Sequence, residues 1–160
     1  MNWQEVCEDK ILQNLPFKIE LNKWGQIILS PAKVIHSFYQ GRIQTLLQSF
    51  LTSGIVMPEL AIQTGDGVKV ADVVWVSDSR ADLILAEDVA SIAPEICIEV
   101  KSTSNTIEEM SEKKAFYFAA GAEEVWICDK NGKLHFYNNQ DQIKYSKRVP
   151  DFPNQIQRNR

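Results

Sequence analysis

The stretch ICIEVK at residues 96–101 combines an apolar strand pattern with two charges at its end. Side chains alternate between the two faces of a strand, so Glu99 and Lys101 are predicted on one face and the isoleucines on the other. The charged pair is separated by roughly 6.6 Å along the strand. A carboxylate and an ammonium at that spacing can address one phosphate group and its metal ion.

Asp72 interrupts a second apolar strand pattern, VKVADVVWV at residues 68–76. A carboxylate inside a central strand needs a cationic partner, a metal ion or open solvent, because burying it unpaired is costly. Two carboxylates suit a hard divalent ion such as Mg²⁺ or Mn²⁺, and the backbone carbonyl of Val100 offers a further oxygen ligand. We therefore expect Asp72 and Glu99 to hold an ion that activates water, with Lys101 stabilising the developing charge on a phosphodiester.

The patterns around these two strands predict an α/β (α+β) fold with a mixed central sheet flanked by helices. A helix is expected from an N-cap at Ser30, followed by Pro31, to Gly54. A second helix is expected from the capping box at residues 106–109 to Ala120. The remaining expected elements are strands at 55–63, 68–76 and 94–100, an N-terminal hairpin within 17–29, a C-terminal hairpin within 124–137, and an ambiguous segment at 79–90.

Length and composition favour one soluble globular domain. The 160 residues can form a single domain spanning 1–160, with a polar tail at 154–160 that is expected to fray. The sequence shows neither a signal-peptide pattern nor a long apolar run, so we expect no membrane segment and a cytoplasmic location. The net charge of −4 is unusual for a nucleic-acid binder, and it predicts weak DNA binding in the absence of metal.

The order of these features resembles the PD-(D/E)XK restriction-endonuclease-like nuclease superfamily. Asp72 followed by Glu99-Val100-Lys101 is similar to the superfamily's Asp…Glu-x-Lys signature, and it lies between a preceding and a following helix as in the common core. Over most of the chain the likeness extends to the Uma-two family, described as restriction endonucleases. This family usually has Pro-Asp where the chain has Ala71-Asp72, and often an apolar residue where it has Lys101.

The family likeness is carried by further residues in matching order, and it implies further site residues. Glu20 before a Gly-containing turn is implied as an extra acidic metal ligand. Lys113 and Tyr117, four residues apart on one helix face, and His36 in the first helix are implied as accessory residues. Nucleases of this kind act on DNA and often form homodimers, so both partners are expectations by analogy.

Simpler interpretations remain open for each of these residues. Glu99 with Lys101 could be an ordinary ion pair at a strand end, and Asp72 could form a structural salt bridge with Lys101 or Arg80. Three functions follow from these alternatives. The first is a Mg²⁺- or Mn²⁺-dependent endodeoxyribonuclease, the second a catalytically silent interaction or regulatory module of the same fold, and the third a hydrolase of another phosphate ester.

Overall fold

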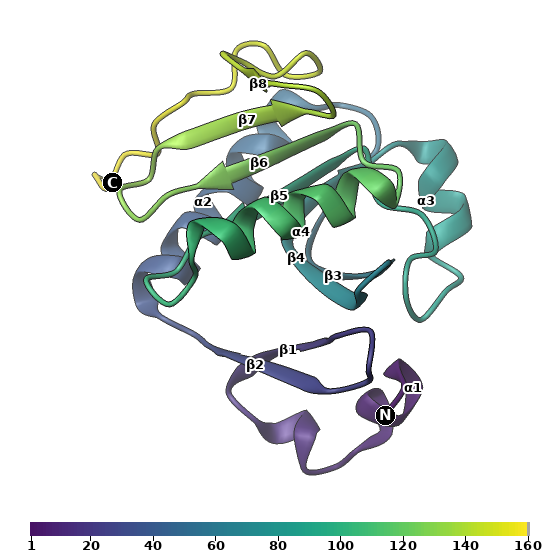
Figure 1. Ribbon diagram of the computed structural model, residues 1–160. Helices are drawn as coiled ribbons and strands as arrows, with labels where there is room; N and C mark the ends of the chain where they lie inside the picture. Colours follow the sequence, from purple (N-terminus) through teal and green to yellow (C-terminus); the bar gives the residue numbers. More distant parts are fainter. Residues whose placement is uncertain (160) are drawn as a thin grey trace.

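The computed structural model describes residues 1–159, and its centre is a six-stranded mixed sheet (Figure 1). Its strands follow in the order β3-β4-β5-β6-β7-β8, and only β5 and β6 are parallel. This confirms the expected mixed sheet. The strands are β3 (Ile55–Thr64), β4 (Gly67–Val76), β5 (Ile96–Val100), β6 (Glu124–Cys128), β7 (Leu134–Asn138) and β8 (Gln142–Ile143).

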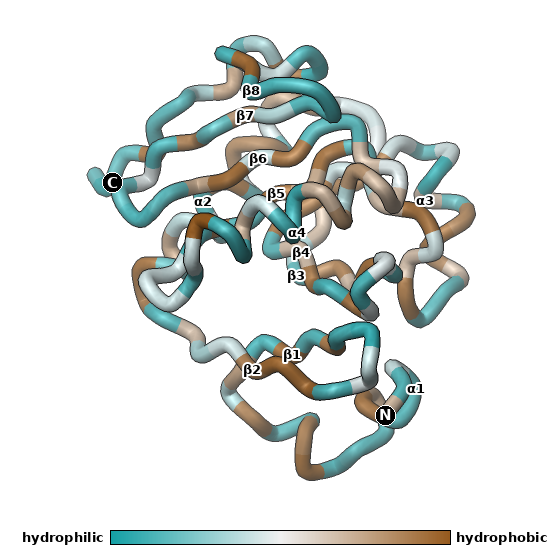
Figure 2. The backbone as a smooth tube through the Cα atoms, viewed as in Figure 1, coloured by the Kyte–Doolittle hydropathy of each residue, from teal (hydrophilic) through white to brown (hydrophobic). Residues whose placement is uncertain are grey.

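Helices α2 (Val34–Phe50) and α4 (Ile107–Ala119) cover opposite faces of this sheet. Helix α2 buries Tyr39, Ile43 and Leu47, which recur every four residues, and each such burial contributes about 1.5–3 kcal/mol. Hydrophobic residues run along β4, β5 and β6 between the two helices (Figure 2). Within residues 1–159 there is no helix with the length and apolar character needed to cross a membrane.

Local capping signals explain where the helices begin and end. Thr106 caps α4, and Glu109 completes the reciprocal capping box that the sequence predicts. Gly121 follows the helix with a φ of 115°. The ambiguous segment at 79–90 contains all but the first residue of a short helix, α3 (Asp78–Ile84), and Ser77 caps the first turn of this helix.

The N-terminal segment forms a small separate layer beside the main sheet (Figure 1). Its elements are α1 (Trp3–Glu8), a 3₁₀ turn (Leu12–Asn14), and the antiparallel strands β1 (Phe17–Leu21) and β2 (Ile27–Pro31). The expected hairpin is confirmed. The expected helix start at Ser30 and Pro31 is wrong, because both residues pair with β1 in the hairpin and the helix begins only at Val34.

The C-terminal segment packs against the β6–β7 turn. The amide of Leu134 donates to the carbonyl of Asn154 over 2.8 Å, and the amide of Ile156 donates to that of Gly132 over 2.8 Å. Ile156 is also buried in the core. Residues 154–156 of the tail that was expected to fray thus pack against the body, and Arg160 lies outside the described residues.

Two glycines provide a test of how the N-terminal hairpin docks. Gly67 has a φ of 76°, and a Cβ there would lie 2.4 Å from the carbonyl oxygen of Leu21 in β1. Gly67→Ala should therefore lower the free energy of unfolding by about 1–3 kcal/mol. Gly41 lies in α2 with open space around it, so Gly41→Ala should raise that energy by about 0.5–1 kcal/mol.

Urea unfolding at constant temperature measures both changes. A Gly67→Ala midpoint equal to that of the native protein would show that the hairpin does not approach this turn so closely. Gly41→Ala serves as the matched control, because the same substitution is made where no backbone strain opposes it.

Candidate functional site

The site begins where β4 and β5 stop pairing. Their backbone register covers Val73 to Trp75 of β4, with Val73 opposite Ile98, and Asp72, the residue preceding Val73, lies just outside it. The amide of Val100 instead donates to Oδ2 of Asp72 over 2.7 Å, so a side chain replaces the next ladder hydrogen bond. The strands thus separate around Asp72, which is only 1% exposed. This separation explains why a carboxylate can lie within a buried central strand.

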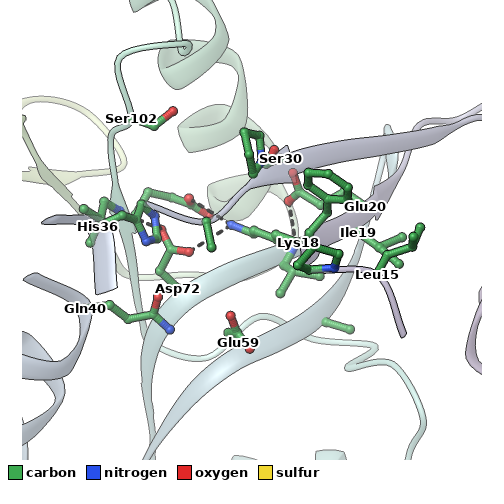
Figure 3. A pocket seen from close by; sticks show the side chains of 18 of the residues that line it. Leu15, Lys18, Ile19, Glu20, Ser30, His36, Gln40, Glu59, Asp72 and Ser102 are labelled. Carbon is green, nitrogen blue, oxygen red and sulfur yellow. Dashed lines mark hydrogen bonds and ion pairs between the residues drawn. The ribbon is translucent and has the colours of Figure 1, made fainter. Parts of the chain in front are cut away.

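Lys18 from β1 reaches into this opening and contacts both predicted metal ligands. Its Nζ lies 3.1 Å from Oδ1 of Asp72 and 3.4 Å from Oε2 of Glu99. Figure 3 shows the Lys18 side chain pointing at Asp72 from the side of the hairpin. The two carboxylates therefore converge on one cation, as the sequence predicts for this pair, but the cation belongs to the protein.

A second lysine joins Glu99 to Glu20. Nζ of Lys113 on α4 lies 2.8 Å from Oε2 of Glu20 and 3.1 Å from Oε1 of Glu99. The hydroxyl of Tyr117, one turn further along α4, donates to Oε1 of Glu99 over 2.6 Å. Glu20 also accepts the amide of Val70 over 2.7 Å. Three residues that the family likeness implied, Glu20, Lys113 and Tyr117, thus meet at Glu99.

His36 closes the other side of the cluster. Its Nε2 lies 3.3 Å from Oδ2 of Asp72, and it comes from the first turn of α2 (Figure 3). The hydrogen bond to Asp72 raises the pKa of His36, although burial and the charge of Lys18 oppose this effect. His36 is therefore part of the site, as a partner of Asp72.

Burial and the neighbouring cations affect the three carboxyl groups differently. Burial opposes ionisation of Asp72, but Lys18 and His36 outweigh it and hold the pKa of Asp72 well below its usual range. Burial likewise opposes ionisation of Glu20, and Lys113 and Lys18 still lower its pKa. For Glu99, burial and the two nearby carboxylates prevail, so its pKa is raised despite both lysines. Glu99 is the group that additional positive charge would stabilise most.

Lys101 does not join the cluster. Within residues 1–159 it forms no ion pair with Asp72 or Glu99, and it does not line the adjoining cavity of about 580 Å³. Strand β5 ends at Val100, so the alternation that placed Lys101 beside Glu99 need not continue past it. The alternative salt bridge from Asp72 to Lys101 or Arg80 is also wrong, because Arg80 pairs with Glu95 over 3.3 Å.

Sequence reasoning missed Lys18. It lies 54 positions before Asp72 in a short exposed-looking hairpin, and nothing local distinguishes it from a solvated lysine. One signal was present, because Lys18 and Glu20 are two apart and therefore share a face of the same strand. Once Glu20 is placed at the site, Lys18 follows on the same side.

Comparisons with known proteins identify the family and the fold of the chain. The profile of the Uma2 family, described as "Putative restriction endonuclease", matches residues 4–159. A crystal structure described as a putative nuclease belonging to DUF820 from Anabaena variabilis superposes with a TM-score of 0.67. It shares 21% sequence identity, and the alignment covers 77% of this chain and 73% of that one. No curated protein matches the chain.

The fold is mixed α+β, and it is shared with a putative nuclease of known structure. The family profile covers nearly the whole sequence, and the chain therefore belongs to the Uma2 family. The resemblance inferred from residue patterns is thereby confirmed.

The pair His36–Asp72 gives a pH prediction. Because the pKa of His36 is raised above its unfolded value of about 6.5, its contribution to stability is fully present below that value. The contribution is lost as pH rises through the folded pKa. In EDTA buffer, His36→Gln should therefore lower the free energy of unfolding by about 0.5–2 kcal/mol more at pH 5.5 than at pH 9. Urea unfolding at both pH values measures this difference.

An NMR titration checks the cause directly. The chain has two histidines, and the signal of His36 should move to a lower pKa in Asp72→Asn, because its partner carboxylate is removed. An unchanged pKa for His36 in that variant would disprove the pairing.

Proposed function

We propose that this chain is a metal-dependent endonuclease that hydrolyses DNA phosphodiester bonds at the opening between β4 and β5. One observation carries the proposal: Asp72 and Glu99 converge on a single cation beside a cavity, in a chain of a family described as restriction endonucleases. Two converging carboxylates bind hard divalent ions, and such ions are the usual means of activating water for phosphodiester hydrolysis.

The donor atoms fit such an ion. Oδ1 of Asp72 and Oε2 of Glu99 face the same point, and the carbonyl of Val100 lies at the same strand edge as the amide that Asp72 accepts. Within residues 1–159 no three Asp, Glu, His or Cys side chains are grouped to hold a metal. A pair of carboxylates can serve Mg²⁺ or Mn²⁺, because these ions retain several waters and need only one or two carboxylates. When bound, the ion polarises a phosphoryl oxygen and acidifies the attacking water.

Lys113 is the residue best placed to stabilise charge on the phosphate. Its ammonium lies 3.1 Å from Oε1 of Glu99, on the side away from Asp72's partner His36, and it lines the cavity. Glu20 and the amide of Val70 fix its position through Oε2 of Glu20, so we assign Glu20 to holding Lys113 rather than to the ion. Tyr117 orients Glu99 by its hydrogen bond and stays protonated, since burial and Glu99 raise its pKa.

Substitution of the two acids tests the site itself. Asp72→Asn and Glu99→Gln should each reduce Mg²⁺-dependent cleavage of duplex DNA by about 10²–10³-fold or more, because each removes a charged oxygen from the ion. Glu108→Gln provides the control, since Glu108 is an exposed acid on α4 that forms no ion pair within residues 1–159. Native-like circular dichroism of the variants must accompany the assay. Undiminished cleavage in either acid variant would refute the proposal.

A second comparison decides which lysine acts. Lys113→Met should reduce the rate of cleavage by about 10²-fold or more, whereas Lys101→Met should change it by less than about threefold. Steady-state kinetics on a fluorescent DNA duplex separate the two. A large loss of cleavage in Lys101→Met with little loss in Lys113→Met would instead assign charge stabilisation to Lys101, as the Glu-x-Lys pattern of the sequence suggests.

The silent-module alternative is favoured by a different observation. Each of the three carboxyl groups already has a partner, because Glu20, Asp72 and Glu99 contact Lys18, Lys113 or His36 without any ion. If the native protein is folded but does not cleave DNA in Mg²⁺ or Mn²⁺, the silent module is favoured over the endonuclease. DNA as the substrate and a homodimer as the assembly remain predictions.

A further inference from the structure

Lys18 occupies a specific position among the oxygens of the cluster. Oδ2 of Asp72 is taken by the amide of Val100 and by His36, and Oε1 of Glu99 is taken by Tyr117 and Lys113. The two oxygens left are Oδ1 of Asp72 and Oε2 of Glu99, and among the described residues Lys18 is the only partner of either. These are the same two oxygens that would hold a divalent ion.

The position of Lys18 between two acidic side chains favours its charged form. Its Nζ lies 3.1 Å from Oδ1 of Asp72 and 3.4 Å from Oε2 of Glu99, so it forms an ion pair with each. Its side chain is only 15% exposed. An ion and this ammonium cannot share the space between the two oxygens, because ligand distances for Mg²⁺ are about 2.0–2.1 Å.

The ammonium has room to leave. Lys18 lines the cavity of about 580 Å³ that adjoins the cluster, together with Ser30, His36 and Ser102 (Figure 3). Rotation about its four side-chain bonds can move Nζ into this space without moving β1. The backbone of the hairpin is held separately, since Glu20 on the same strand is bonded to Val70 on β4.

Accordingly, we propose that Lys18 holds the position of the divalent ion in the free protein, and that loading the site is an exchange of one cation for another. This inference rests on the proposed function. The exchange replaces one positive charge with two between Asp72 and Glu99, and it places the released ammonium in the cavity that a phosphodiester would enter. Loading of the ion and binding of the anionic substrate therefore favour each other.

Mn²⁺ binding by calorimetry at pH 8 tests the exchange without relying on cleavage. Lys18→Met keeps the apolar length of the side chain and removes the competing charge. It should bind Mn²⁺ at least about tenfold more tightly than the native chain, a factor that corresponds to about 1.4 kcal/mol. Lys18→Arg retains the charge and should show no such gain. Lys10→Met, at an exposed lysine outside the site, is the control for loss of a positive charge.

Thermal melting provides a second readout if Lys18→Met is less stable in EDTA. Mn²⁺ should then raise the Tm of Lys18→Met more than the Tm of the native protein, because the tighter site gains more from the same free ion concentration. A larger rise in Lys18→Met than in Lys18→Arg and Lys10→Met supports the exchange.

Two outcomes overturn the inference, and they differ in what they say about the proposed function. Equal Mn²⁺ affinity in the native chain and in Lys18→Met would show that Lys18 does not compete with the ion, while leaving the metal site in place. Absence of Mn²⁺ binding and of any Tm rise in all variants would overturn both the exchange and the metal-dependent mechanism.

Discussion

The burial of three carboxylates in one cluster is the constraint on which the rest of the structure depends. Asp72, Glu99 and Glu20 are 1%, 4% and 6% exposed, and each would be strongly destabilising without a partner. Lys18 and Lys113 supply the charge that makes this burial tolerable. Removing one member of such a cluster leaves an uncompensated charge, so the cluster must assemble as a unit with the fold.

That constraint explains why the N-terminal layer packs where it does. The apolar cluster that joins the N-terminal layer to the body is built on three buried residues, Val6 of α1, Leu21 of β1 and Val68 of β4. The polar attachments of the hairpin are the more specific ones, since Lys18 and Glu20 both reach the opening between β4 and β5. A two-stranded sheet is marginally stable alone, and here the buried charge cluster fixes its position against the body.

The cluster also reconciles an acidic chain with the proposed activity. A net charge of −4 disfavours DNA binding in general, but the site gathers its own cations close to the carboxylates. Positive charge added between Asp72 and Glu99 would favour the ionised form of Glu99, whose pKa burial raises. Binding of an anionic substrate in the cavity therefore depends on the charge near the site rather than on the net charge of the chain.

The sequence by itself determined the elements whose signals are local. The apolar runs of β4 and β5, the capping box of α4 and the interruption by Asp72 are all visible within a few residues, because alternation and capping act over short distances. These signals placed Asp72 and Glu99 correctly on neighbouring strands. The family likeness added Glu20 and Lys113 by their order in the chain.

Only the tertiary structure decided the partners of those acids. Lys18 could not be singled out from the sequence, because it lies 54 positions from Asp72. The two residues come into contact only when the hairpin docks on the main sheet, and no local sequence pattern indicates this docking. Ser30 and Pro31 resemble a helix start, but pairing with β1 draws them into β2, so nonlocal hydrogen bonds override the capping preference. Lys101 follows the end of β5, where strand alternation no longer fixes a side chain's direction. Contacts between distant segments decide such positions, since their energies depend on how the whole chain packs.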